Sequence, residues 1–79
     1  MHYVYILRGI NNKFYKGFTA DLKKRFADHN SGKVRSTKNG KPWELIYYES
    51  FKDKILARKE ELFLKTGKGR ERIKYLLKG

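Results

Sequence analysis

Cysteine is absent from this 79-residue chain, and proline, methionine and tryptophan each occur once. Without cysteine there is no disulfide framework, thiolate zinc site or cysteine nucleophile, so the core must hold the fold unaided. No stretch approaches the roughly 18 consecutive apolar residues of a membrane-spanning helix, and the first residues lack the pattern of a secretory signal. We therefore expect a cytoplasmic protein that is neither secreted nor inserted in a membrane.

Acidic residues are also scarce, since 8 Asp and Glu stand against 20 Lys and Arg, and the formal net charge is +12. This excess favours a polyanionic partner, nucleic acid first, because cations that neutralise phosphates release bound counterions. An anionic membrane surface or simple solubility would require the same sign of charge. Charge alone does not choose among these three.

Apolar residues make up 39% of the chain and aromatic residues 15%, which is more than a disordered polycation contains. The length predicts a single domain, residues 1–79, with a small core. We expect a monomer.

Local patterns predict three strands and three helices. Residues rich in Tyr, Val, Ile, Phe and Trp indicate strands, and helical spacing of apolar residues indicates helices. The expected strands are 2–8, 13–18 and 43–51, and the expected helices are 20–31, 55–65 and a last one from residue 70. Thr19 is the expected cap of the first helix, and Gly67 and Gly69 are expected to end the second. Residues 33–42 are predicted to be a mobile basic loop. The order β-β-α-β-α-α indicates an α+β domain with one small sheet.

Three features could carry chemistry, and the first is tyrosine, which occurs six times. Tyr3, Tyr5 and Tyr15 all fall in the predicted hairpin of the first two strands. Packing explains any one of them, but Tyr3 and Tyr5 share a face of one strand, so a site with paired hydroxyls is an alternative.

The second feature is Arg25 and His29, which lie four residues apart on the first predicted helix. A cation and an imidazole on the same helix face could bind a phosphate. The alternative is an ordinary solvated face that also carries Lys23, Lys24 and Asp28.

The third feature is the acidic pair Glu60 and Glu61 on the second predicted helix. A protein that cleaves a phosphate ester commonly keeps a carboxylate for a divalent cation. Helical periodicity places Glu60 within the apolar arc and Glu61 at its border, so the pattern slightly favours Glu60 as the unusual residue. Ion pairing on a solvated helix is the commoner meaning of such glutamates.

The order of these features resembles the GIY-YIG nuclease superfamily. The resemblance runs from Tyr3 to about Lys74 and is closest to small single-domain bacterial members, similar to the catalytic module of the DNA excision-repair incision subunit. Its motifs are Tyr3-Val4-Tyr5, Tyr15-Lys16-Gly17, the segment 21–30 with Arg25 and His29, Pro42-Trp43, and Ala57 with Glu61, Leu64 and Lys65.

This resemblance implies a three-stranded antiparallel sheet flanked by three helices and a set of catalytic residues. The catalytic residues that it implies are Tyr5, Tyr15, Arg25, His29 and Glu61. It selects Glu61 over Glu60 as the ligand of one Mg²⁺ or Mn²⁺. Arg25 would bind phosphate oxygens and stabilise the phenolate of Tyr5 or Tyr15, which could then act as the base.

We therefore expect a one-metal endonuclease that acts on nucleic acid, on DNA rather than RNA. One alternative is a non-catalytic nucleic-acid-binding module. In either case the expected nucleic-acid contacts are Lys16, Lys33, Arg35, Lys38 and Lys41. A third interpretation treats the last helix, with its stripe of Ile73, Leu76 and Leu77, as a membrane-surface or partner-docking helix.

Overall fold

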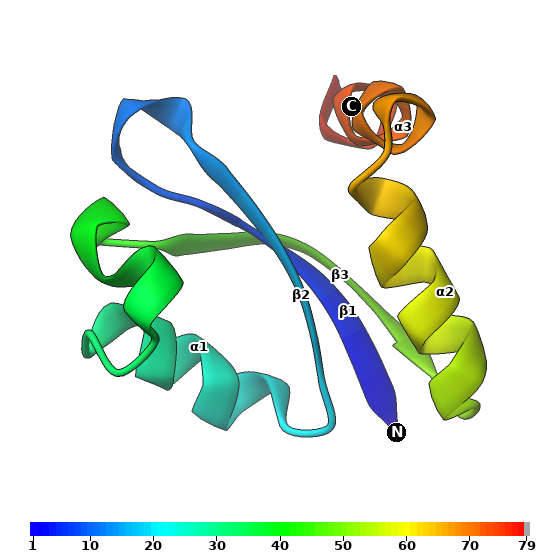
Figure 1. Ribbon diagram of the computed structural model, residues 1–79, viewed down its shortest axis with the longest axis horizontal. Helices are drawn as coiled ribbons and strands as arrows, with labels where there is room; N and C mark the ends of the chain where they lie inside the picture. The colour runs from blue at the N-terminus through cyan, green and yellow to red at the C-terminus, as the bar shows by residue number, and fades with distance from the viewer. Residues whose placement is uncertain (79) are drawn as a thin grey trace.

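A computed structural model describes residues 1–78 of the chain (Figure 1). The order of strands and α-helices is β-β-α-β-α-α, with two 3₁₀ helices, η1 and η2, in the connections. The elements are β1 His2–Arg8, η1 Ile10–Asn12, β2 Phe14–Thr19, α1 Leu22–Asn30, η2 Arg35–Gly40, β3 Glu44–Phe51, α2 Lys54–Leu64 and α3 Gly67–Lys78. The predicted α+β class, the three-stranded sheet and its three flanking helices are confirmed.

The sheet is antiparallel, with strand order β2-β1-β3. The first strand takes the centre because Val4, Tyr5, Ile6 and Leu7 are all buried, which requires cover on both faces. In the register, Tyr5 lies opposite Gly17 of β2 and Tyr48 of β3. The two remaining strands are therefore edges.

Alternation along β1 divides the core into two clusters, one on each face of the sheet. One face carries Val4 and Ile6, which pack against α2 and α3; the other carries Tyr5 and Leu7, which pack with Trp43 and residues of α1. Figure 1 shows α1 and η2 on one side of the sheet and the α2–α3 pair on the other. The two sets of helices therefore present different residues to one thin sheet.

The first helix starts two residues later than predicted. Asp21, rather than Thr19, is its N-cap, and the Asp21 carboxylate accepts the backbone N–H of Lys24 at 3.1 Å. The Thr19 hydroxyl instead accepts the backbone N–H of Asp21 at 3.1 Å. Thr19, two residues earlier, thus fixes the loop before the helix, and the Asp21 carboxylate caps the helix N-terminus, where negative charge is favoured.

The predicted role of Gly67 and Gly69 is wrong, because α2 ends at Leu64 and both glycines lie in the first turn of α3. The Thr66 hydroxyl accepts the backbone N–H of Gly69 at 3.1 Å and so begins α3. A Cβ at residue 69 would overlap the carbonyl oxygen of Phe63. The glycine therefore allows two helices to meet at close range rather than ending one of them.

The predicted basic loop is also more regular than expected, since η2 occupies most of it and buries Thr37 and Gly40. The Trp43 indole N–H donates to the Thr37 carbonyl at 2.8 Å, and a Cβ at Gly40 would overlap the indole ring. This segment is anchored to the core through a tryptophan that lies outside it.

The apolar stripe of α3 packs on the sheet instead of facing outward. Ile73 is buried and Leu77 packs against the same cluster. The last helix thus closes the core, in contrast to the docking helix considered above. Within residues 1–78, no helix is both long and apolar enough to cross a membrane.

Candidate active site

Tyr5 lies at the centre of the sheet, and its side chain crosses over β2. The residue is 1% exposed, and a Cβ at Gly17, its neighbour across the ladder, would overlap the Tyr5 hydroxyl. Any larger residue at position 17 would displace the phenol. The Tyr5 ring position thus depends on a glycine in the adjacent strand.

His29 is fully buried and connects Tyr5 to η2. Its Nε2 atom lies 2.8 Å from the Tyr5 hydroxyl, and its Nδ1 atom lies 2.7 Å from the Thr37 hydroxyl. The Thr37 hydroxyl donates to the Val34 carbonyl at 3.4 Å, so it accepts from Nδ1–H. By this network Nε2 carries no proton and accepts the Tyr5 hydroxyl proton.

Tyr15 completes an aromatic cluster around the imidazole. Its ring centroid lies 4.8 Å from that of His29 and 6.3 Å from that of Tyr5. Trp43 contacts the outer edge of Tyr15, with ring centroids 6.4 Å apart. The rings restrict the imidazole to one orientation and keep bulk water from it.

Arg25 lies one turn before His29 on α1 and contacts both tyrosines. Its pKa is raised above the ordinary value, first by the polar contact with Tyr5, although partial burial acts the other way. The pKa of His29 is lowered, first by burial and then by the charge of Arg25. The imidazole is therefore neutral at neutral pH, as the hydrogen-bond network requires.

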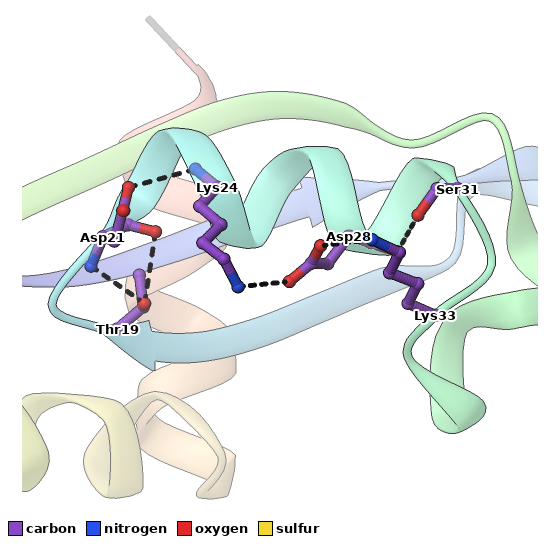
Figure 2. Close-up of polar contacts among 6 residues, drawn as sticks. All are labelled: Thr19, Asp21, Lys24, Asp28, Ser31 and Lys33. Atoms are coloured by element: carbon purple, nitrogen blue, oxygen red, sulfur yellow. Dashed lines mark hydrogen bonds and ion pairs between the residues drawn. The ribbon is translucent and has the colours of Figure 1, made fainter.

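The acids near Arg25 are already occupied by other groups. Figure 2 shows Asp21 at the helix cap and Asp28 beside Lys24 and Lys33, whose ammonium groups lie 3.6 Å and 4.0 Å from its carboxylate oxygens. Within residues 1–78, Arg25 has no ion pair. It lines a cleft of roughly 280 Å³ at the start of α1, together with Asp21, Lys24 and Asp28.

The predicted phenolate is corrected by the structure at Tyr5. Burial raises the pKa of the Tyr5 hydroxyl to about 12, although the contact with Arg25 lowers it. Desolvation is the largest influence, because the ring has no access to water. Tyr5 is therefore a neutral phenol that donates to His29, and Arg25 alone does not ionise it.

Glu61 belongs to α2, which lies on the other side of the sheet from α1 (Figure 1). It is 5% exposed, and its charge contributes to raising the pKa of Tyr5. Its carboxylate oxygens accept from Arg58 Nη1 at 2.5 Å and from Lys65 Nζ at 3.1 Å. Glu60 lies instead 3.1 Å from Arg72. Helical periodicity slightly favoured Glu60 as the unusual residue, and the structure shows that Glu61 is the more buried of the two.

A divalent cation at Glu61 would have to take the place of Lys65 or Arg58 on one carboxylate oxygen. Within residues 1–78, no group of three or more His, Cys, Asp or Glu side chains comes together. A single carboxylate fits Mg²⁺ or Mn²⁺ that keeps several waters and takes its other ligands from a substrate phosphate. The donor set therefore fits the predicted cation.

Sequence comparison assigns this chain to a known family. The model of the GIY-YIG catalytic domain matches residues 1–74. The chain belongs to the GIY-YIG nuclease superfamily. A UPF0213 protein of Staphylococcus haemolyticus is 37% identical over 76 residues, covering 95% of this chain and 93% of that protein. A UPF0213 protein of Streptococcus pyogenes is 40% identical over 76 residues, covering 94% and 83%.

A solved structure agrees on the GIY-YIG fold. The solution NMR structure of a UPF0213 protein from Bacillus halodurans superposes with a TM-score of 0.61 and 32% identity, covering 95% of this chain and 83% of that one. Membership of the GIY-YIG superfamily implies nucleic acid as the partner, in agreement with the net charge of +12.

The structure brings the predicted site residues Tyr5, Tyr15, Arg25 and His29 into one cluster. The charge of Glu61 contributes to the raised pKa of the Tyr5 hydroxyl. The five basic residues that were predicted to contact nucleic acid divide into two groups. Four are exposed on and around η2, namely Lys33, Arg35, Lys38 and Lys41. Lys16 is half-buried on β2 and lies beside α3.

Two supporting residues were not found from the sequence. Thr37 orients His29, and Asn30 ties α1 to β3 by accepting the Trp43 backbone N–H at 2.6 Å and donating to the Trp43 carbonyl at 2.9 Å. The one signal in the sequence is that Asn30 directly follows His29. Nothing in the basic segment around Thr37 marks its hydroxyl as buried.

Proposed function

We propose that the protein is an endonuclease that uses one divalent cation to hydrolyse phosphodiester bonds in nucleic acid, with DNA preferred to RNA. The observation that supports this most directly is the chain of hydrogen bonds from Tyr5 through His29 to Thr37, next to Arg25, which makes no ion pair within residues 1–78. A structural core has no need for a buried proton acceptor on a hydroxyl that an arginine also contacts.

In the proposed reaction, Arg25 binds two oxygens of the scissile phosphate through its planar fork. Arg25 contacts the Tyr5 hydroxyl, and Tyr5 is 1% exposed, so movement of Arg25 toward the phosphate gives a water access to Tyr5. Tyr15, which is half-buried beside Tyr5, forms the other wall of this access.

The proton transfer then passes from water through the Tyr5 hydroxyl to His29, which becomes an imidazolium and afterwards releases its extra proton to solvent. The water oxygen forms its bond to phosphorus as its proton moves to the Tyr5 hydroxyl oxygen and the Tyr5 proton moves to His29 Nε2. The bond between phosphorus and the leaving oxygen breaks, and that oxygen takes a proton from solvent. The raised pKa of Tyr5 makes this relay easier than forming a free phenolate first.

Glu61 would hold the proposed cation in place of Lys65 or Arg58, which bind its carboxylate in this structure. The chemistry that Mg²⁺ or Mn²⁺ would supply at Glu61 is withdrawal of charge from the phosphoryl oxygens. Because this chain offers one carboxylate, the affinity for metal is weak until substrate phosphate is present.

A second candidate function is nucleic-acid binding without cleavage. The observation that favours it is that both oxygens of Glu61 already have cationic partners within the chain. In that case Arg58 and Lys65 keep their places, and the basic residues around η2 supply the affinity.

The test is cleavage of duplex, single-stranded, flap and junction DNA and of matched RNA, with Mg²⁺, Mn²⁺ or EDTA. We expect metal-dependent cleavage that Tyr5→Phe slows by about 100-fold or more, because the relay loses its hydroxyl. Tyr48→Phe, at an exposed tyrosine of β3, is the matched control and should cleave normally. DNA affinity should be unchanged in both variants.

Melting temperature serves as the folding control, since Tyr5→Phe leaves the buried Nε2 of His29 without a donor, at a cost of about 1–3 kcal/mol. Equal cleavage with EDTA and with metal would exclude the metal mechanism. DNA binding with no cleavage of any substrate would favour the binding module.

A further inference from the structure

A second basic pocket lies between β2 and α3. It measures about 300 Å³ and is lined by Phe14, Lys16, Arg70, Ile73 and Lys74. Phe14 and Lys16 are two apart on a strand and so share one face, and Arg70 and Lys74 are four apart on a helix and so share one face. Ile73 is buried and forms the floor.

Three cations meet in this pocket without an acidic partner. Within residues 1–78, none of Lys16, Arg70 and Lys74 makes an ion pair. The pKa of Lys16 is lowered, first by burial and then by the charges of Arg70 and Lys65. Like charges held together in this way are relieved by an anion placed among them.

An exposed aromatic ring borders the same pocket. Phe14 is 45% exposed at the start of the edge strand β2. Cations that track a backbone, next to aromatic rings on which bases stack, are the usual means of binding single-stranded nucleic acid. The chemistry of the pocket therefore suits a phosphate with an adjoining unstacked base.

The pocket and the candidate active site are joined by β2. Tyr15 and Lys16 are consecutive on this strand and point to opposite faces, so Tyr15 faces His29 and Lys16 faces α3. Lys65 binds Glu61, and its charge also helps to lower the pKa of Lys16. Figure 1 shows α3 on the opposite side of the sheet from α1. A strand bound at Arg25 would reach the pocket by passing over the β2 edge near Glu61.

We propose, resting on the function proposed above, that this pocket binds a backbone phosphate of the substrate near the cleaved bond, with an unpaired base against Phe14. The substrate class is then nucleic acid with a single-stranded segment beside the cleavage position, such as a flap or an open junction. A continuous duplex keeps its bases stacked and cannot use Phe14.

The test measures binding of a single-stranded oligonucleotide and of the same sequence as a duplex, by fluorescence anisotropy in EDTA, so that cleavage plays no part. Arg70→Ala with Lys74→Ala removes two exposed cations from the pocket. Lys52→Ala with Lys59→Ala removes two exposed cations elsewhere and is the matched control. Phe14→Leu keeps an apolar side chain but removes the ring.

We expect the pocket double variant to bind the single strand about tenfold more weakly and to lower the slope of log affinity against log salt by about 0.7, the contribution of one phosphate contact. The control pair should keep the wild-type slope. Phe14→Leu should weaken binding of the single strand about tenfold and leave binding of the duplex unchanged. Melting temperatures should stay close to wild type, since the substituted cations are exposed.

Equal loss of affinity in the pocket and control pairs would overturn the phosphate site, and unchanged single-strand binding by Phe14→Leu would overturn the base contact. Selective loss in a protein that cleaves no substrate supports the pocket and rejects the nuclease. Metal-dependent cleavage by wild type, with no selective loss in the variants, rejects the pocket and supports the nuclease.

Discussion

Burial and charge act in opposite directions on the Tyr5 hydroxyl, and burial prevails. Arg25 lowers the pKa of Tyr5, yet desolvation raises it to about 12. The same two influences both lower the pKa of His29. A neutral phenol thus donates to an unprotonated imidazole nitrogen at 2.8 Å, and both pKa shifts oppose a proton transfer that would leave a phenolate beside an imidazolium.

Residue spacing predicted part of this arrangement. The four-residue interval of Arg25 and His29 correctly placed both on one helix face, because a helix of any length brings such pairs together. Periodicity gave no reason to prefer Glu61, because Leu56 and Phe63 of the expected apolar arc are exposed, whereas Ala57 and Leu64 form the buried face of α2 that also carries Glu61. Arg58 and Lys65, one turn before and after, cover its carboxylate.

Glu61→Gln should abolish cleavage, because an amide oxygen binds a divalent cation far more weakly than a carboxylate. The fold and the affinity for DNA should be kept, since the change removes negative charge. Glu60→Gln is the matched control on the same helix and should retain wild-type cleavage. The measurement is initial cleavage rate against Mg²⁺ concentration. A silent Glu61→Gln together with an inactive Glu60→Gln would show that the neighbouring residue holds the metal.

At the scale of elements, the sheet was predictable and η2 was not. Strands 2–8 and 43–51 were found to within one residue of their observed bounds because apolar and aromatic residues dominate them. The segment of η2 is polar, and what orders it lies outside it: the indole of Trp43 and the imidazole of His29, both of which bind Thr37. Local patterns cannot report a partner that only tertiary structure supplies.

Thr37→Val should slow cleavage by about tenfold or more, because the nearly isosteric side chain no longer accepts from His29 Nδ1–H. The imidazole is then free to adopt the other tautomer, in which Nε2 carries the proton and cannot receive one from Tyr5. Thr37→Ser keeps the hydroxyl and should restore the rate. The pH dependence of the rate distinguishes this role from mere packing, since Thr37→Val should shift the apparent pKa of the acidic limb. A profile of unchanged shape in Thr37→Val would contradict the positioning role.

At the junction of α2 and α3, two glycines that look alike in the sequence have different surroundings. A Cβ at Gly69 would overlap backbone atoms of Phe63 and Leu64, whereas a Cβ at Gly67 has no neighbour within 4 Å. The start of the last helix was predicted at residue 70 instead of Gly67, because glycine usually ends a helix, while this pair lies within the first turn of the next one.

Gly69→Ala should therefore destabilise the protein by about 1–3 kcal/mol through overpacking. Gly67→Ala should be neutral or stabilising by up to about 1 kcal/mol, because alanine restricts the unfolded chain. Urea denaturation of both variants gives the two free energies of unfolding. Equal effects of the two substitutions would show that the helices do not meet at Gly69.

At the scale of the whole molecule, most ion pairs join an acid to a nearby Lys or Arg, but two acids, Glu60 of α2 and Glu49 of β3, lie next to each other. Glu60 lies beside Glu49 of β3 and Arg72 of α3, and its pKa is raised to about 7, first by burial and then by Glu49. Arg72, 3.1 Å away, acts the other way without cancelling this. Tyr47 borders the same group, and its pKa is raised by burial and Glu49. A strongly basic protein thus contains a local excess of negative charge.

This pair gives the molecule a predictable dependence of stability on pH. Because the pKa of Glu60 is higher in the folded protein, the folded state binds more protons than the unfolded state between about pH 4.5 and 7. Glu60 therefore stabilises the fold at low pH, and this contribution is lost as pH rises through about 7. His29, whose pKa is lowered, has the opposite sign below its ordinary value, so wild type alone does not isolate the effect.

The difference between wild type and Glu60→Gln removes the contribution of His29, which both proteins share. The melting temperature of the variant relative to wild type should rise from pH 5 to pH 8, because glutamine cannot ionise beside Glu49. Each kcal/mol of relief corresponds to about 4–8 °C in a domain of this size, and partial exposure of the group reduces the relief to about 1 kcal/mol. Melting by circular dichroism at fixed ionic strength measures this difference. A difference that stays constant from pH 5 to pH 8 would mean that Arg72 keeps Glu60 ionised throughout, and the carboxyl pair would then carry no pH dependence.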